Sequence, residues 1–196
     1  MTELKLKGCS NLTSLSCRNN ELTELDISDC TKLTELRCAN SKLASLKLDK
    51  VNLTFLDCSN NKLTEIDISK CTRLKELFCE QNALKSLDLT GMSSLENLHC
   101  WNNPVKTLNL DDCKSLKIIN CAGCSLEKLN INPCKNLTTL YCKQNRFQPA
   151  LDVSKATALS ALDCTLNPEL SELLISRNQS IKTLQKDPET KIVLVD

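Results

Sequence analysis

The chain of 196 residues has few of the residue types on which many enzymes depend. It contains one histidine, one tryptophan, one tyrosine and three glycines, and aromatic residues make up only 3% of it. Three glycines do not form the glycine-rich loop that cradles a phosphate. Neither a pair of carboxylates in a pocket nor a Ser–His–Asp arrangement can be assembled. The sequence therefore argues against an enzyme and against a bound cofactor.

Neither a charge of one sign nor a long apolar run is present. Lys and Arg number 25 against 24 Asp and Glu, and the two signs are interspersed. This excludes the extended positive field that non-specific binding to nucleic acid or to an acidic membrane requires. No apolar run approaches the length of a membrane-spanning helix, so we expect no membrane insertion.

Residues 1–10 show no signal-peptide pattern. The sequence as given thus favours a cytoplasmic location. An exported or cell-surface protein is expected instead if a signal peptide precedes Met1 in a longer chain.

What the chain does contain is a repeat. The stretch LTFLDCSNNKLTEI at residues 53–66 recurs at intervals of 20 to 22 residues. Each copy joins an LxxLxCxxN pattern, here called the A half, to an LxxLxIxxC pattern, called the B half. The A halves begin at Leu12, Leu33, Leu53, Leu74, Leu95, Leu116, Leu137 and Leu159. Each A-half cysteine is followed three residues later by a polar turn position, which is Asn20, Ser41, Asn61, Asn82, Asn103, Cys124, Asn145 or Asn167.

This nested pattern of 10 and 11 residues resembles the leucine-rich repeat family, and within it the bacterial class with a 21-residue period, similar to internalin-type and Bacteroidetes repeat proteins. The resemblance implies one mainly β, right-handed solenoid over residues 1–196. We expect a half-repeat without an N-terminal cap at 1–11, about eight repeats at 12–180 and a C-terminal cap at 181–196. That cap should contain a strand at Lys191–Val195.

The connections between the apolar segments are too short for helices. We therefore expect little or no helix and two parallel sheets, one from each half-repeat, facing each other across a core of Leu and Cys. The turn Asn should be structural, its side-chain amide meeting unpaired main-chain groups where each coil bends. The resemblance places the A-half sheet on the concave side.

The 14 cysteines raise the alternatives of a disulfide scaffold and a metal protein. Eight share the A-half position, and five more share the last position of the B half: Cys9, Cys30, Cys71, Cys113 and Cys134. Stacked coils lie about 4.8 Å apart with parallel side chains, whereas a relaxed disulfide needs Cβ atoms roughly 3.5 to 4.5 Å apart. We therefore expect free thiols acting as small buried hydrophobic groups, which suits a reducing compartment.

The one metal-like pattern is CxxC at Cys121 and Cys124, with Cys100 and Cys142 in the flanking copies. Cys121 belongs to the A-half column, and Cys124 replaces a turn Asn. A zinc site needs a second such pair or a histidine directed at the same point. His99 precedes Cys100 in an expected strand and so points to the opposite face. We expect no metal, and the same geometry argues against a Cys–His nucleophile.

Function must come from the outward positions, where the two halves differ. The B-half positions are monotonous, as in Thr23, Glu24, Asp26 and Ser28, which indicates a solvated scaffold face. The A-half positions vary in kind from copy to copy. They carry four of the five aromatic residues, and the fifth, Phe147, replaces a core Leu. Trp, Tyr and Arg are frequent interface anchors. The expected partner-binding residues are Arg37, Phe55, Phe78, His99, Trp101, Ile118, Tyr141 and Lys143.

Two functions fit these positions. The first is a non-catalytic protein-binding module that presents the A-half sheet to an unidentified protein. The alternative is a glycan-binding surface on which Trp101 and Tyr141 stack against sugar rings. Because Met1, Leu4, Leu6 and Cys9 already follow the B-half pattern, the first coil has no polar cap in the sequence as given. Self-association through that coil is a further expectation.

Overall fold

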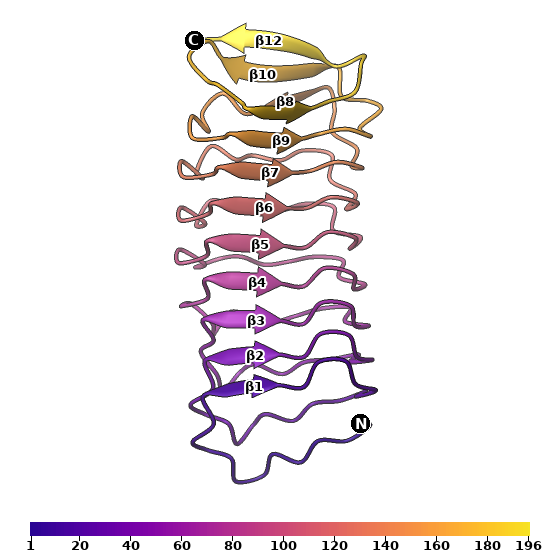
Figure 1. Ribbon diagram of the computed structural model, residues 1–196, viewed down its shortest axis with the longest axis vertical. Coiled ribbons are helices and arrows are strands. Elements are labelled where there is room, and N and C mark those ends of the chain that lie inside the picture. The colour runs from indigo at the N-terminus through magenta and orange to yellow at the C-terminus, as the bar shows by residue number, and fades with distance from the viewer.

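The computed structural model describes residues 1–196 and consists of strands joined by turns, without a helix. It therefore has no helix suited to crossing a bilayer. Figure 1 shows the coils stacked along the long axis. The strands are β1 (Ser14–Ser16), β2 (Glu35–Arg37), β3 (Phe55–Asp57), β4 (Glu76–Phe78), β5 (Asn97–His99), β6 (Ile118–Asn120), β7 (Thr139–Tyr141), β8 (Ala150–Asp152), β9 (Ala161–Asp163), β10 (Glu172–Ser176), β11 (Thr183–Gln185) and β12 (Lys191–Val195).

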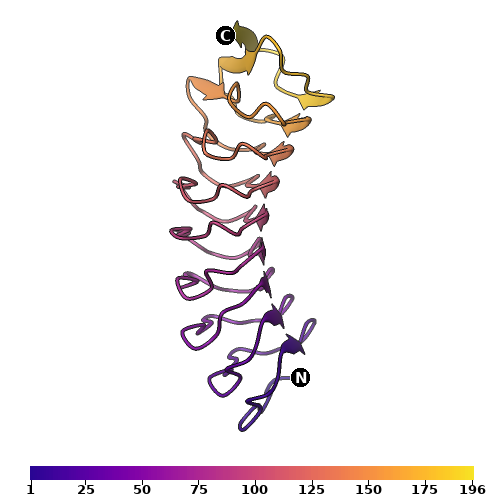
Figure 2. The same ribbon diagram turned by 90° about the vertical axis from the view of Figure 1, so that its left-hand side faces the viewer.

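The A halves form one parallel sheet of nine strands in the order β1-β2-β3-β4-β5-β6-β7-β9-β11. Equivalent positions of successive repeats pair directly, so Leu36 lies opposite both Leu15 and Leu56. The repeat period thus fixes the register. Figure 2 shows that the stack is curved and that this sheet follows its concave side. The expected solenoid without helices is confirmed.

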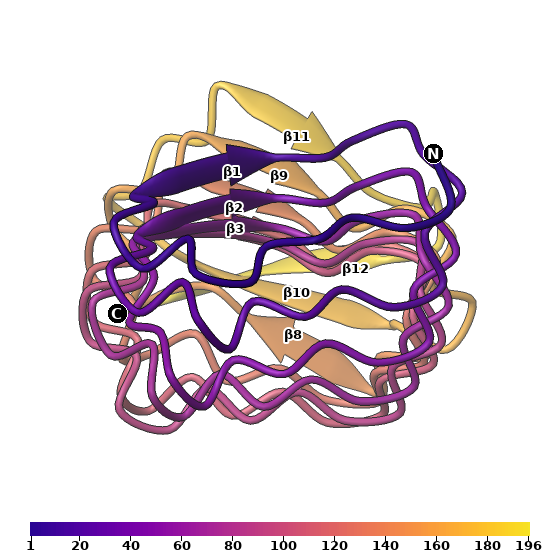
Figure 3. The ribbon, with the colours of Figure 1, turned by 90° about the horizontal axis from the view of Figure 1, so that it is seen from below.

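The expectation that every B half contributes to a second sheet was wrong. That sheet is confined to the C-terminal end, where β8, β10 and β12 pair in the order β12-β10-β8. It includes the capping strand expected at Lys191–Val195. The earlier B halves form no strands, because the coils fan apart on the convex side (Figure 2). Their amides also have local acceptors: the N–H groups of Ser28 and Ser69 each donate to the Asp two residues earlier at 2.9 Å. Seen along the stack, the nine-stranded sheet lies on one side and β8 on the other (Figure 3).

The core is a continuous column of 53 buried hydrophobic residues between the two sides of the coils. Its members are mainly the Leu, Ile and Cys residues of the repeat, and Phe147 occupies a Leu position with no exposure. At the N-terminal end, Leu4, Leu6 and Cys9 pack against this column but are only partly buried. Self-association through that coil stays a prediction.

The cysteines line the core as a ladder. All 14 are free thiols in the structure, and every one except Cys9 is buried. The expected burial of the cysteine columns is confirmed.

The turn asparagines form a second ladder, with one side chain in each of six coils and interruptions at Ser41 and Cys124. The side-chain amide of Asn103 donates to the carbonyls of Cys100 in its own coil and Cys79 in the preceding coil, both at 3.0 Å. Its Oδ1 accepts the N–H of Leu84 at 3.0 Å. The structural role expected for these residues is confirmed. Where Cys124 replaces the Asn, its Sγ donates to the carbonyl of Cys100 at 3.5 Å.

The residue before the turn position of each A half adopts the left-handed backbone conformation. It is two residues after the A-half Cys and is Asn in four coils, with φ between 51° and 57°. Asn tolerates this region better than other residues with a Cβ. Gly123 takes the position in one coil, where a Cβ would collide with the Asn102 side-chain oxygen. Leu166 takes it in the last repeat, with φ 59° and 59% exposure.

Leu166→Gly is therefore expected to stabilise the fold by about 1 kcal/mol, because glycine adopts this conformation without strain and little packing is lost. Urea unfolding followed by circular dichroism measures the change. The Leu166 N–H donates to Asp187 Oδ1 at 2.9 Å, a bond that glycine keeps. A loss of stability would contradict the assignment of strain to this residue.

Candidate binding face

The concave face consists of the outward residues of the A-half strands and the residue after each A-half Cys. Three columns run along it, because outward positions alternate with the inward Leu and Cys. Coil 4, which contains β4, contributes Glu76, Phe78 and Glu80. Coil 5, which contains β5, contributes Asn97, His99 and Trp101. Most of these side chains are half-buried by their neighbours in the next coils.

Four expected residues form a continuous row across coils 2 to 5. The Arg37 guanidinium carbon lies 4.0 Å from the centre of the Phe55 ring. The Phe55 and Phe78 ring centres are 5.6 Å apart with the planes tilted by 36°. Phe78 and His99 stack with centres 4.7 Å apart and planes within 18°. Ring pairs of this kind contribute about 0.5 to 1.5 kcal/mol each beyond burial, so the row is held in place before any partner arrives.

Trp101, Ile118, Tyr141 and Lys143 complete the expected set but lie outside this row. The Trp101 main chain pairs with coil 4, since the Gln81 N–H donates to the Trp101 carbonyl at 2.9 Å. Trp101 therefore occupies the position equivalent to Glu80 and is half-buried. Ile118 lies between Asn97 and Thr139. Tyr141 is 42% exposed and forms no ring contact. The expectation that none of these side chains belongs to the core is confirmed.

Two ion pairs hold basic residues on the N-terminal part of the face. Arg37 Nη1 donates to Glu35 Oε2 at 2.8 Å. Arg18 forms a salt bridge with Asp57, whose carboxylate also accepts the Ser59 hydroxyl at 2.7 Å. Asp57 is only 3% exposed, whereas the Arg18 side chain is 45% exposed, so the buried carboxylate anchors Arg18 at the face. The sequence patterns indicated neither pairing.

Glu76 and Glu80, which flank Phe78, form no salt bridge. The Glu80 Oε2 atom is buried and has no hydrogen-bond partner. Burial, together with the negative charge of Asp57, raises the pKa of Glu80 to about 7. Burial lowers the pKa of His99, against the opposing effect of Glu76, which favours the neutral imidazole. Sequence reasoning missed these carboxylates because Glu is common at any outward position.

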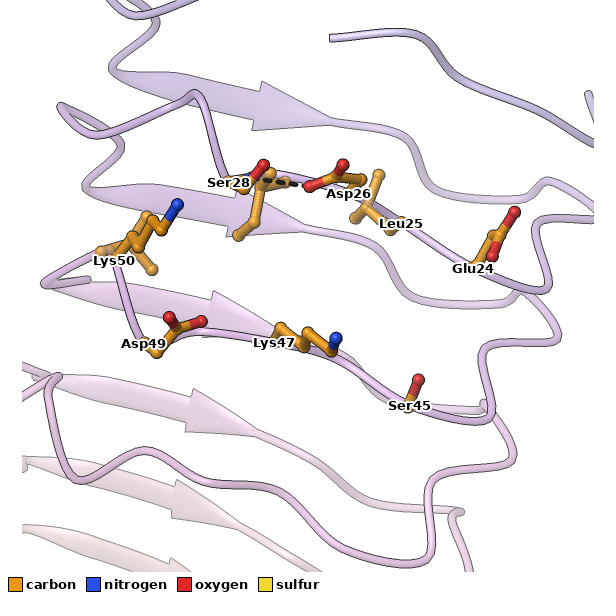
Figure 4. A pocket seen from close by; sticks show the side chains of 10 residues that line it. Glu24, Leu25, Asp26, Ser28, Ser45, Lys47, Asp49 and Lys50 are labelled. Atoms are coloured by element: carbon orange, nitrogen blue, oxygen red, sulfur yellow. Dashed lines mark hydrogen bonds between the residues drawn. The ribbon is translucent and has the colours of Figure 1, made fainter. Parts of the chain in front are cut away.

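Two of the hollows on the surface bear on the choice between the two faces. One, of about 410 Å³, borders the ring row and is lined by Glu35, Arg37, Thr54, Phe55, Arg73, Lys75, Glu76 and Ser94. The other, of about 530 Å³, lies on the B halves of the first coils (Figure 4). There Glu24 and Asp26 line it from one coil, and Lys47, Asp49 and Lys50 line it from the next coil. The Asp26 pKa is lowered mainly by its bond from Ser28. This second hollow is the solvated scaffold face.

No group of three or more His, Cys, Asp or Glu side chains is arranged to hold a metal ion. The Cys121–Cys124 pair lies in the core. Cys124 is held by its bond to the Cys100 carbonyl, and burial raises the pKa of Cys121.

Two family models match parts of the chain: Leucine Rich repeats (2 copies) over residues 51–91 and Leucine Rich Repeat over residues 11–33. No match was found among curated proteins. Among solved structures, the chain is similar to the functional domain of InlJ from Listeria monocytogenes, which includes a cysteine ladder. The identity is 34% and the TM-score 0.87, over 100% of this chain and 48% of that one.

Two further structures share the fold. Internalin C2 from Listeria monocytogenes is 18% identical, with a TM-score of 0.71 over 95% of this chain and 82% of that one. The ectodomain of the receptor kinase GASSHO1/SCHENGEN3 from Arabidopsis thaliana was solved in complex with CASPARIAN STRIP INTEGRITY FACTOR 2. It is 27% identical, with a TM-score of 0.65 over 83% of this chain and 21% of that one.

The coil geometry and these matches define the chain as a leucine-rich repeat protein. Within that class it is of the bacterial, internalin-like type. The chain spans about half the length of the InlJ chain that it matches, 48%. Leucine-rich repeat solenoids commonly bind other proteins on the extended concave surfaces that their curvature creates.

Proposed function

We propose that the protein is a non-catalytic protein-binding module whose concave face receives the partner. The observation that carries this proposal is the preformed row of Arg37, Phe55, Phe78 and His99, flanked by Trp101. Rings on the outward side of a sheet contribute nothing to the core, and such amphipathic anchors are enriched in interfaces. The complex described for the plant receptor ectodomain supports a protein partner.

The size of the face also supports this function. The part between Phe55 and Lys143 covers five coils, or roughly 20 Å of sheet at the usual strand spacing. This length suits a modest protein interface. The free thiols along the core support a compartment in which thiols stay reduced, so the location included in this proposal is cytoplasmic.

The test is to capture partners from a cell extract on the immobilised protein, identify them by mass spectrometry and measure binding with the purified partner. Trp101→Ala and Tyr141→Ala are each expected to weaken binding by about 2 kcal/mol or more, roughly 30-fold. The fold should survive, because neither ring belongs to the core.

Asp67→Ala and Lys85→Ala are the matched controls on the B halves, where both residues are exposed. They should change the affinity by less than about 0.5 kcal/mol. Equal losses on the two faces, or losses on the B halves alone, would show that the concave face is not the interface. A glycan array probed in parallel tests the alternative. Binding to sugars that requires Trp101 and Tyr141, with no captured protein, would replace this proposal by glycan recognition.

A further inference from the structure

The Arg37 side chain shows how the concave face can bind a cation. The Arg37 guanidinium lies over the Phe55 ring at 4.0 Å and donates to Glu35 at 2.8 Å. Aromatic faces attract cations electrostatically, and a carboxylate at the rim adds a charged hydrogen bond. The ring and the carboxylate together form a cation site that the chain fills with its own side chain.

Coils 4 and 5 also place aromatic rings beside carboxylates, but no Arg or Lys side chain of the chain pairs with these carboxylates. Glu76, Phe78 and Glu80 alternate on one face of the same extended segment, and His99 and Trp101 occupy the equivalent positions in coil 5. Neither glutamate forms a salt bridge, although Lys75 is next to Glu76 in the chain. The half-buried Glu80 has an oxygen with no hydrogen-bond donor. An unpaired buried polar atom is costly, and a donor supplied by a ligand would remove that cost.

We propose that Glu76, Phe78, Glu80, His99 and Trp101 form a cation site that takes an arginine or lysine side chain of the partner protein. The inference rests on the proposed function and specifies the chemistry of the partner. A carboxylate side chain of a partner would meet two unpaired negative groups here. A neutral apolar side chain would leave the Glu80 oxygen buried without a donor.

This arrangement predicts that the affinity for a cation depends on pH. A cation beside Glu80 favours the ionised carboxylate, so binding should strengthen as the pH rises through about 7, the value to which burial raises the pKa of Glu80. The charged group that acts on Glu80 is Asp57, which is paired with Arg18. Burial raises the pKa of the thiols of Cys58 and Cys79, and the charge of Glu80 adds to this rise. His99 of coil 5 pairs with Phe78, and the charge of Glu76 acts on its imidazole. Protonation of its imidazole at lower pH adds a positive charge, which weakens cation binding in the same direction.

Trp101 is the only tryptophan of the chain, so its fluorescence reports on the site directly. The probes are N-acetyl-Gly-Gly-Arg-Gly-Gly-amide and the same peptide with citrulline, the neutral analogue of arginine. At pH 8 the arginine peptide should change the fluorescence saturably, with an affinity at least ten-fold higher than that of the citrulline peptide. At pH 5.5 its affinity should fall about ten-fold.

Glu80→Gln is expected to lower the affinity for the arginine peptide at least five-fold at pH 8 and to make that affinity less dependent on pH. Glu65→Gln, an exposed B-half glutamate, is the control and should change neither. Equal affinity for the two peptides, or a Glu80→Gln variant that binds like wild type, would overturn the cation site. A lack of response of Trp101 to any peptide would also overturn it. Failure of the proposed function is recognised separately, by a captured partner that Tyr141→Ala does not weaken, because Tyr141 lies outside this site.

Discussion

Asn103→Ala is expected to lower the free energy of unfolding by about 3 to 4 kcal/mol. The Asn103 side chain is only 2% exposed. It forms hydrogen bonds with three main-chain groups, which are the carbonyls of Cys79 and Cys100 and the N–H of Leu84. Alanine leaves all three without a partner at a buried turn. Each unsatisfied buried group costs about 1 to 3 kcal/mol, and partial access of water reduces the sum.

Asn20→Ala is the matched control, because Asn20 has the same place in the first coil. Its amide bonds only the carbonyls of Cys17 and Arg18, and it is half-buried. We expect a loss of about 1 kcal/mol there. Urea unfolding followed by circular dichroism compares the two variants, with the denaturant slope checked for a change in cooperativity. Equal losses at the two positions would contradict a role for the ladder in joining neighbouring coils.

The repeat period allowed most of the fold to be predicted from the sequence. In-register Leu and Cys columns specify which side chains are inward, and a period of 20 to 22 residues leaves no room for helices. The repeat period did not predict that the second sheet is confined to the C-terminal coils. That limit depends on the curvature of the whole stack and on amides such as that of Ser69, which bonds Asp67 instead of the next coil.

The candidate site was predictable only in part. The alternation of inward and outward positions placed Phe55, Phe78 and His99 on one face, because parity is local information. Phe78 and His99 are direct partners in the sheet, but the Phe55–Phe78 contact crosses the coils diagonally. That contact and the position of Arg37 over Phe55 depend on side-chain rotamers. The distinction between paired and unpaired carboxylates, such as Glu35 and Glu80, depends on which base can reach each of them. The chain pattern alone does not contain that information.

Native thiols are expected to react with iodoacetamide at pH 8 at least 100-fold more slowly than the thiols of the unfolded chain, with Cys9 and Cys124 as the exceptions. The thiolate is the reactive form. Burial raises the pKa of Cys134 to about 11 and those of Cys113 and Cys164 to about 12. A rise of two units or more above the ordinary value reduces the thiolate fraction by about 100-fold or more, and exclusion of the reagent from the core slows the reaction further.

Mass spectrometry after timed alkylation counts the labelled cysteines. In native protein the first label should appear on Cys9, the one thiol that is not buried. Among the buried thiols, Cys124 should react first, because the hydrogen bond from the Cys100 side chain lowers its pKa. Under denaturing, non-reducing conditions all 14 should be labelled in protein kept from air. Fewer than 14 would mean that disulfides form within the ladder, because an oxidised pair cannot react. Rapid native labelling of Cys79 or Cys142 would show that the coils open far more readily than their burial implies.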